Sequence, residues 1–283
     1  SNIIKIVRGD EVSWKFSSPF YKIGQEEKSM GYPEDLLGTR AIVKPGLWAV
    51  IPDTGLVNNK IPEITGCYNS IVASPKMGAG FVQIVVEGKK GGKTVKPYAK
   101  AEGIESFIYL VEGEAILKTE GVEEQFQAGG YVYAPPGAGI EFEIVSDQAK
   151  LLLYKQKYIP YENLKPYAIA KNINDIEYQI YDGMKEVLIK DFLPTDDLAF
   201  DMNMHILSFE PGACHPFVET HVQEHGAYVL TGEGMYLLDD TWMGIKKNDF
   251  MWMGAYCPQA AYGVGREAFS YIYSKDCNRD VVL

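Results

Sequence analysis

The chain has 283 residues, which is enough for one large domain or two of ordinary size. Hydrophobic residues make up 46% of it and charged residues 23%, values that exclude a largely disordered chain. The formal net charge is −11 and no basic block occurs, which excludes nucleic acid and anionic membranes as partners of the surface as a whole. The four cysteines include no C-x-x-C pair, which predicts reduced thiols in a cytoplasmic protein.

Short strands dominate the predicted elements. Any helical period is weak and confined to 174–178. No apolar run approaches the roughly 18 residues of a membrane span. In chain order, β-branched or aromatic segments near Gly, Pro or Lys residues predict strands at 81–86, 107–111, 131–133, 151–154, 186–189, 202–209, 228–230, 234–238, 250–253 and 269–273. Many short strands with Gly-rich turns predict an all-β sandwich or barrel.

The chain contains an internal repeat with an offset of 119 residues. Residues 105–114 align with 224–233, and the two segments share a Tyr, a Gly and the Glu that follows it. At the same offset, residues 130–135 fall on 249–254. Both copies have the order strand, Gly-Glu turn, strand, polar turn and aromatic strand, which predicts two similar β-barrels in tandem.

The repeat also gives the expected domain boundaries. Residues 1–40 fit neither copy and are expected to form an N-terminal arm. Residues 41–155 are expected to form the first barrel and residues 186–283 the second. Between the barrels, residues 156–185 contain two prolines and are expected to be an irregular linker.

All four histidines of the chain lie within 21 residues of the second repeat. The densest part is 219–225, which reads Glu-Thr-His-Val-Gln-Glu-His. Because side chains alternate along a strand, Glu219, His221 and His225 are expected to face one way inside a barrel. Two imidazoles and one carboxylate are a recognised site for a divalent metal ion.

Two alternatives remain for this segment. It also matches His-x-x-Glu-His, the inverted zinc-protease pattern, which requires His221 and His225 to lie one turn apart on a helix. The residues before it (216–218) and Gly226 after it do not favour a helix. The second alternative is a polar cluster that satisfies its own hydrogen bonds, although burying three ionisable groups without a metal is costly.

The pattern Gly-x6-Glu-x-His-x3-His-x6-Gly at 212–232 is similar to the first cupin motif, with Glu219 where the usual first histidine stands. The second cupin motif usually ends in Pro-x-Gly-x-x-His. The first repeat keeps that frame but ends it at Ile140, and the offset carries this last position to Gln259. The resemblance implies a bicupin, with two tandem double-stranded β-helix (jelly-roll) barrels in one chain. It implies the metal ligands Glu219, His221, His225 and Gln259.

With this ligand set the chain resembles one bicupin family, the (S)-ureidoglycine aminohydrolases of purine (allantoin) catabolism. The similarity runs from about Met30 to the C-terminus and includes 200–205, Met253 with Gly254, and 271–279. It implies Mn²⁺ as the cofactor. It also implies hydrolysis of (S)-ureidoglycine by water to (S)-ureidoglycolate and ammonia.

The resemblance implies three further pocket residues, Tyr236, Tyr271 and Lys275. Tyr271 and Lys275 share one face of a strand and are the candidate catalytic residues. All three are candidate substrate-binding residues. Lys275 is expected either to carry a proton to the leaving amine or water, or to act as a plain cation for the substrate carboxylate. The phenols are expected to orient the substrate, and the alternative for each is core packing.

The first repeat has lost the ligands, because the offset places Lys100, Glu102, Ser106 and Ile140 at the four ligand positions. The first barrel is therefore expected to be a scaffold and an interface. The resemblance implies a homo-oligomer with a small-molecule substrate.

Other functions and roles stay open. The ligand pattern alone is also typical of an Fe²⁺ dioxygenase of the cupin type, or of another metal-dependent enzyme for small molecules. A binding or storage cupin commonly lacks the ligands, so their presence argues against that role. His205 is expected to be a packed, hydrogen-bonded residue near the barrel wall. His215 is expected at the pocket rim or on the surface.

Overall fold

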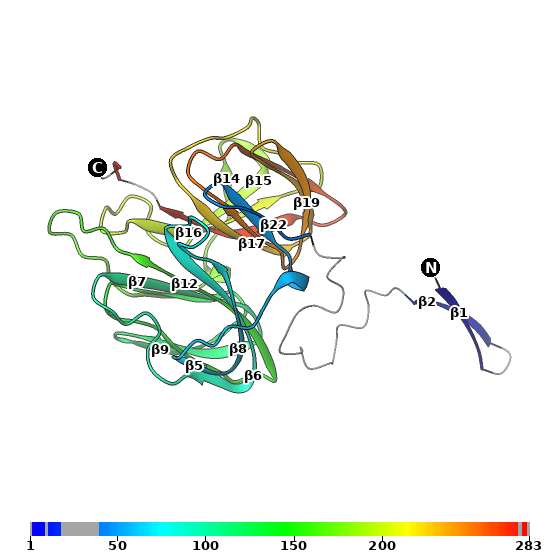
Figure 1. The fold of residues 1–283 in the computed structure, drawn as a ribbon, viewed down its shortest axis with the longest axis horizontal. Coiled ribbons are helices and arrows are strands. Elements are labelled where there is room, and N and C mark those ends of the chain that lie inside the picture. Colours follow the sequence, from blue (N-terminus) through cyan, green and yellow to red (C-terminus); the bar gives the residue numbers. More distant parts are fainter. Residues whose placement is uncertain (1, 9–10, 18–39, 277–278, 282–283) are drawn as a thin grey trace. The chain divides into compact units, whose positions relative to one another are not determined.

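The computed structural model describes residues 2–8, 11–17, 40–276 and 279–281 (Figure 1). The chain divides into two units, Ser1–Gly31 and Tyr32–Leu283. The first contains an antiparallel pair, β1 (Asn2–Arg8) and β2 (Glu11–Ser17). The rest of the expected arm lies largely outside the described residues. All features below belong to the second unit.

The predicted all-β fold is confirmed. Among the described residues the only helical elements are two short 3₁₀ turns, η2 (Asp53–Gly55) and η3 (Ile173–Asp175). The weak helical period at 174–178 overlaps only η3. None of the helices described is long and apolar enough to cross a membrane. Every segment predicted as a strand lies within one, and two predicted ranges match observed strands in full, β16 (Met202–Phe209) and β20 (Phe250–Met253).

The first barrel is built on a nine-stranded sheet. Eight strands follow the order β13-β10-β7-β12-β6-β11-β8-β9, and β5 pairs with β6. Its members are β5 (Ile64–Ala73), β6 (Phe81–Thr94), β7 (Ile104–Glu112), β8 (Glu114–Thr119), β9 (Val122–Gln127), β10 (Gly130–Ala134), β11 (Glu141–Ile144), β12 (Gln148–Lys157) and β13 (Ile169–Asn172).

The second barrel consists of an eight-stranded sheet and a three-stranded sheet. The larger has the order β14-β15-β16-β22-β17-β20-β4-β3, and the smaller has the order β19-β18-β21. The remaining members are β3 (Ile42–Lys44), β4 (Trp48–Ile51), β14 (Gln179–Tyr181), β15 (Met184–Asp191), β17 (His225–Thr231), β18 (Glu233–Leu238), β19 (Thr241–Lys246), β21 (Gln259–Val264) and β22 (Phe269–Asp276).

The internal repeat is visible strand by strand. Shifting β8 and β9 by 119 residues gives the bounds of β18 and β19 without adjustment. At one place the strand pairing matches residues of the two barrels differently from the offset of 119 residues. Tyr98 bridges Ile140 in the first barrel, whereas Glu219 bridges Gln259 in the second. By strand pairing, Tyr98 rather than Lys100 therefore stands at the position of Glu219.

Two short strands, here called the exchanged strands, pair across the expected domain boundaries. β4 comes from the expected first barrel and pairs with β20 in the second barrel, and β13 comes from the expected linker and pairs with β10 in the first barrel. Residues 156–185, expected to be an irregular linker, thus contain β13 and β14. Each exchanged strand covers an edge that would otherwise expose unpaired backbone groups. The sheets therefore cross the expected domain boundaries, which local sequence patterns could not show.

Alternation along β16 separates two cores. Leu207 and Phe209 pack inside the second barrel, whereas Met204 and Ile206 pack in the core that joins the barrels. A third core fills the first barrel. The odd-numbered positions of β16 therefore face the interior of the second barrel.

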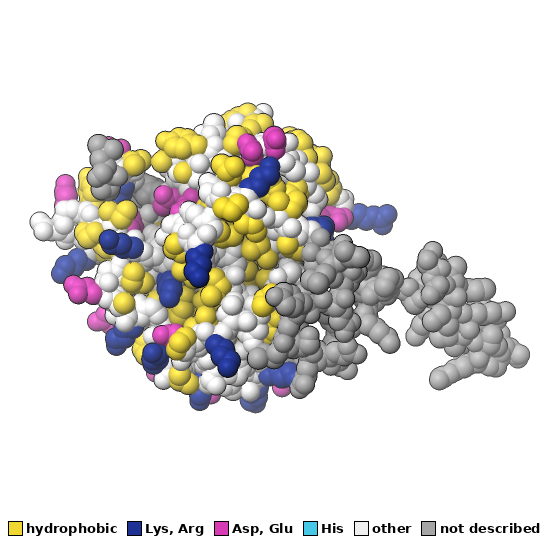
Figure 2. Space-filling model, viewed as in Figure 1, with side chains coloured by type: hydrophobic (Ala, Val, Ile, Leu, Met, Phe, Trp, Pro, Cys, Tyr) yellow, Lys and Arg dark blue, Asp and Glu magenta, His cyan; other side chains and the backbone are white. Residues whose placement is uncertain are grey.

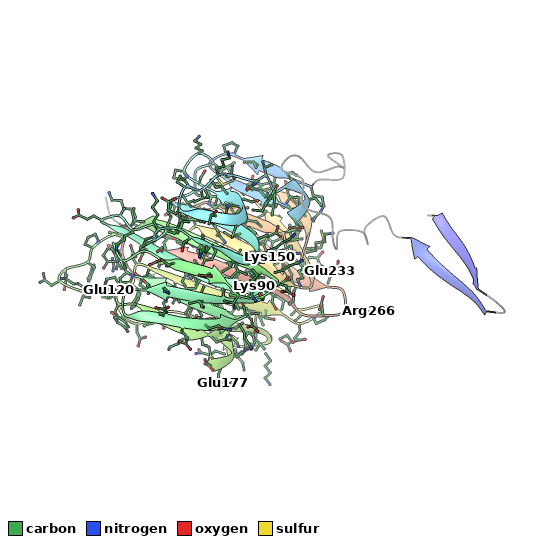
Figure 3. The ribbon with its side chains drawn as sticks, turned by 90° about the horizontal axis from the view of Figure 1, so that it is seen from below. Lys90, Glu120, Lys150, Glu177, Glu233 and Arg266 are labelled. Atoms are coloured by element: carbon green, nitrogen blue, oxygen red, sulfur yellow. The ribbon has the colours of Figure 1, made fainter. Side chains whose placement is uncertain are left out.

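Charged side chains lie mainly at the periphery. Figure 2 shows Lys and Arg interspersed with Asp and Glu on one face, with no large basic patch there. Exposed residues such as Glu120, Glu177 and Arg266 project outward from the sheets (Figure 3). The barrel cores consist mainly of apolar side chains, and one group of buried polar side chains lies in the second barrel.

Candidate metal centre

The polar group lies where the β16–β17 connection approaches β21. Glu219 forms an isolated bridge to Gln259, the first residue of β21, and His225 is the first residue of β17. The intervening residues 220–224 form neither strand nor helix. The expectation of one continuous strand over 219–225 is therefore wrong, because the segment bends before β17. The helical zinc-protease alternative is also wrong.

A close approach of the barrels fixes the start of β17. A Cβ atom added at Gly226 would lie 2.6 Å from the ring of Phe81 in β6 and 2.5 Å from Oε1 of Gln83. Only glycine leaves room for that approach. The backbone N–H of Gly226 donates to the hydroxyl of Ser274. These contacts hold the neighbouring His225 against β22.

The two histidines present their Nε2 atoms to each other. His225 Nδ1 donates to the carbonyl of Ser274 at 2.8 Å, and His221 Nδ1 donates to the carbonyl of Gln223 at 3.0 Å. A carbonyl only accepts, so each hydrogen lies on Nδ1 and each Nε2 carries a lone pair. The two Nε2 atoms are 3.3 Å apart. Backbone acceptors that fix Nδ1–H in this way are typical of metal-ligating histidines.

Both imidazoles are held in the neutral form that a metal requires. Burial and the nearby His221 lower the pKa of His225 to about 3. Burial and the charge of Lys275 lower the pKa of His221.

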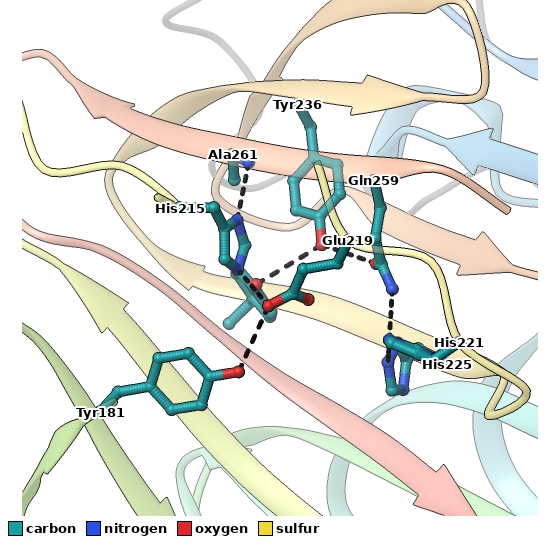
Figure 4. Close-up of polar contacts among 9 residues, drawn as sticks. Tyr181, His215, Glu219, His221, His225, Tyr236, Gln259 and Ala261 are labelled. Atoms are coloured by element: carbon teal, nitrogen blue, oxygen red, sulfur yellow. Dashed lines mark hydrogen bonds and ion pairs between the residues drawn. The ribbon is translucent and has the colours of Figure 1, made fainter. Parts of the chain in front are cut away.

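Gln259 completes a group of three converging side chains. Its Nε2 donates to His221 Nε2 at 2.9 Å, and its Oε1 accepts from the hydroxyl of Tyr236 at 3.3 Å (Figure 4). The hydroxyl of Tyr236 lies 3.5 Å from that of Tyr271, and both tyrosines are buried. Burial raises the pKa of both phenols, so they remain protonated donors.

The carboxylate of Glu219 points to other partners. The backbones of Glu219 and Gln259 exchange two hydrogen bonds of 2.8 and 2.9 Å, which places the two residues side by side. The Glu219 Oε1 atom accepts from Tyr181 at 3.4 Å and lies 4.0 Å from His215 Nε2 (Figure 4). Among the described residues, no three His, Cys, Asp or Glu side chains are grouped to hold a metal. The structure therefore brings His221, His225 and Gln259 together, with Glu219 beside them.

Two members of this group were not expected from the sequence. His215 is 8% exposed, so it is neither a rim nor a surface residue, and its Nδ1 accepts from the backbone N–H of Ala261. Tyr181 comes from the stretch expected to be a linker. The clustering of histidines in the sequence was a signal for His215, whereas nothing in the sequence pointed to Tyr181.

Lys275 lies on the same β22 face as Tyr271 and Tyr273. Its charge is one of the causes that lower the pKa of both His221 and His225, so it faces the same region. The chain is thus a bicupin whose second barrel holds a candidate metal centre, with two imidazoles, an amide and a carboxylate.

Sequence comparison narrows this class. An (S)-ureidoglycine aminohydrolase of Escherichia coli (strain K12) is 49% identical over 255 residues, which cover 89% of this chain and 97% of the relative. The chain belongs to the (S)-ureidoglycine aminohydrolase family. A probable (S)-ureidoglycine aminohydrolase of Oryza sativa subsp. japonica is 27% identical over 268 residues, covering 93% and 84% of the two chains. No family model matches the chain.

Solved structures confirm the bicupin fold. Protein Ylba from E. coli superposes with a TM-score of 0.79 at 46% identity, covering 89% of this chain and 100% of that one. A putative glyoxylate-induced protein from Pseudomonas aeruginosa has a TM-score of 0.78 at 31% identity, covering 91% and 99%. Oxalate decarboxylase of Bacillus subtilis, described with Mn(II) centres, has a TM-score of 0.62 at 11% identity and covers 85% and 79%. That last likeness concerns the fold alone.

Proposed function

We propose that the second barrel catalyses the hydrolysis of (S)-ureidoglycine by water to (S)-ureidoglycolate and ammonia. Membership of the aminohydrolase family supports this reaction. The observation that carries it is the pair of imidazole Nε2 atoms, 3.3 Å apart, beside the amide of Gln259. These residues lie inside the barrel, next to buried phenols and a lysine that suit a small polar substrate.

The proposal includes Mn²⁺ held by Glu219, His221, His225 and Gln259. Imidazole and hard oxygen donors without a thiolate suit Mn²⁺ or Fe²⁺. A bound divalent ion would supply Lewis-acid charge to the substrate. The residues fit this role because both histidines keep Nε2 free of hydrogen. Gln259 would offer its oxygen, since an amide nitrogen has no lone pair to donate. The carboxylate of Glu219 would bind the ion in place of its hydrogen bond from Tyr181.

The remaining residues of the site would orient the substrate. Tyr236 and Tyr271 are protonated donors inside the barrel and would hydrogen-bond the ureido group. Lys275 would pair with the substrate carboxylate or carry a proton to the leaving amine. Fixing two ends of the substrate exposes one face of its reacting carbon, which would account for selectivity between the mirror-image forms.

The proposed assembly is a cytoplasmic homo-oligomer that acts on a small molecule and has no nucleic-acid or membrane partner. The net charge of −11 supports the last point. Light scattering of the purified chain would test the oligomer. The proposed domain boundaries remain 1–40, 41–155, 156–185 and 186–283, with the exchanged strands crossing them.

The test of the reaction is ammonia release from freshly generated (S)-ureidoglycine, because we expect this substrate to be unstable. The metal-free protein and the Mn²⁺-loaded protein are compared, and the handedness of the product is determined in the same sample. We expect fast release with Mn²⁺ and only (S)-ureidoglycolate formed. Release at the spontaneous rate, with Mn²⁺ demonstrably bound, would contradict the proposal. Oxygen uptake in its place would indicate the dioxygenase alternative.

A further inference from the structure

A second pair of ionisable residues lies in the same barrel, outside the group described above. His205 on β16 and Asp191 at the end of β15 are directly opposite each other in the antiparallel pairing. His205 Nδ1 lies 2.7 Å from Asp191 Oδ1. A carboxylate only accepts, so Nδ1 carries the hydrogen and Nε2 carries the lone pair.

The Nε2 atom of His205 is buried without a partner. The residue is 6% exposed, and no group in the described part of the chain hydrogen-bonds to this atom. A buried polar atom without a partner is costly, because it gives up its hydrogen bonds to water. The expectation of a packed, hydrogen-bonded histidine near the wall is therefore correct for Nδ1 only.

The ring of His205 belongs to the region of the candidate metal centre. Position 205 shares the inward face of β16 with Leu207 and Phe209. The ring of His205 stacks on Tyr273 at 5.0 Å between centroids, and the ring of Tyr273 also contacts that of His225, likewise at 5.0 Å. Two residues from His205 along β16, Asn203 is opposite Lys275 of β22.

We propose that His205 accepts the proton of the attacking water, and that Asp191 is the positioning residue that fixes its tautomer. This inference rests on the proposed aminohydrolase function. The arrangement is the one in which a carboxylate on one ring nitrogen keeps the other nitrogen available as a base.

The proposed step balances as follows. The oxygen of water forms the new C–O bond, and its proton passes to Nε2 of His205. The substrate's ammonium group leaves as ammonia with the electron pair of the C–N bond. The imidazolium is stabilised by Asp191 and then releases its proton to ammonia or to solvent, which returns His205 to its starting form.

The charges around His205 are consistent with a neutral base. Burial lowers the pKa of His205, the hydrogen-bonded Asp191 on β15 opposes that change, and the charge of Lys275 on β22 adds to it. On β17, His225 faces the same space and is itself neutral at ordinary pH. His205 is therefore free to take up a proton at neutral pH.

The experiment combines substitution with rescue by small bases. His205→Ala, measured in the full-length Mn²⁺-loaded protein, should lower kcat by about 10²- to 10⁴-fold, the usual contribution of a general base. The Mn²⁺ content should not change. Added imidazole should restore turnover, whereas pyrazole, which has nearly the same shape but is a far weaker base, should not. Met204→Leu is the matched control, because Met204 is adjacent to His205 in the sequence but its side chain faces the core between the barrels.

The outcomes separate a base from a packing residue. Rescue by both azoles alike, absence of rescue by imidazole, or a kcat within about threefold of native would overturn the inference, since a general base is worth far more than that. If His205→Ala does not fold, Asp191→Asn decides, because it keeps an acceptor for Nδ1–H and removes only the charge. It should lower kcat at unchanged Mn²⁺ content, and unchanged kcat overturns the inference.

The native protein, measured in the same assay, tests the proposed function separately. If native protein releases ammonia and the variants behave as native, the inference alone fails. If the native protein with Mn²⁺ releases none, the proposed function fails and the inference fails with it.

Discussion

Gln259 and His221 are joined by a direct hydrogen bond of 2.9 Å between the amide nitrogen and Nε2. The bond occupies the same lone pair that a metal ion would use. The opposite end of the amide is held by the hydroxyl of Tyr236. The amide thus links the candidate ligands to the candidate substrate-binding phenols.

Gln259→His should therefore keep the metal and lower turnover. An imidazole supplies a nitrogen ligand in place of the amide oxygen, but it cannot also accept from Tyr236 through the same atom. Metal content by emission spectrometry and ammonia release are the measurements. Gln259→Ala is the comparison and should weaken metal binding as well. Equal metal loss in both variants would show that this position does not accept the usual cupin ligand.

His221→Ala and His225→Ala should each abolish both metal binding and ammonia release above the spontaneous rate. Each removes one of two Nε2 donors, and no other described side chain stands in for it. Gln223→Ala is the matched control. Its backbone carbonyl, not its side chain, accepts from His221 Nδ1, so the hydrogen bond survives the substitution. Full activity in a metal-free histidine variant would rule out the metal mechanism.

Trp48→Ala should destabilise the protein by about 3–5 kcal/mol, as for other large aromatic truncations in cores. Trp48 lies on the exchanged strand β4, is fully buried, and packs in the core of the second barrel. Leu47→Ala is the control, because Leu47 precedes Trp48 but its side chain is 50% exposed. Its truncation should change the free energy of unfolding by less than about 0.5 kcal/mol. Urea unfolding measures both. Equal, small effects would mean that β4 does not belong to that core.

The stability of the protein should fall as pH rises, because of Glu105 between the barrels. Glu105 is fully buried and accepts from Tyr133 at 2.6 Å and Gln156 at 2.7 Å. Burial, together with the neighbouring Asp201, raises the pKa of Glu105 well above its usual 4.5. The folded state therefore keeps a proton that the unfolded state releases. The contribution of Glu105 to the free energy of unfolding is complete below pH 4.5, the pKa of the unfolded state, and is lost as the pH rises through the folded-state pKa.

Glu105→Gln should flatten this dependence, because the amide stays neutral at every pH. Thermal midpoints measured between about pH 5 and pH 8, where the unfolded carboxyl is ionised, should decline less steeply than those of the native protein. Glu120→Gln is the control, since Glu120 is exposed. Parallel slopes for the native protein and Glu105→Gln would show that Glu105 is ionised in the fold.

The sequence was informative where the signal is local. The β-branched and aromatic runs predicted β16 and β20 in full, and the repeat predicted two barrels. The exchange of β4 and β13 depends on pairing between strands more than 35 residues apart, which no local period encodes. The partnership of His205 with Asp191 was also hidden, because it depends on the register of β15 against β16, which local sequence patterns do not show. The direction of the Glu219 carboxylate depends on Tyr181, a residue with no motif around it.

Lys275→Arg should separate the two roles left open for this residue. Arginine keeps the positive charge but stays protonated, so it can pair with a carboxylate and cannot pass on a proton. If Lys275 carries a proton, KM should stay close to native and kcat should fall by about 10²- to 10⁴-fold, because the proton step is lost while binding is kept. Lys275→Met, which lacks the charge, should raise KM as well. Native kcat in Lys275→Arg would assign Lys275 to charge pairing alone and leave proton transfer to other residues of the barrel.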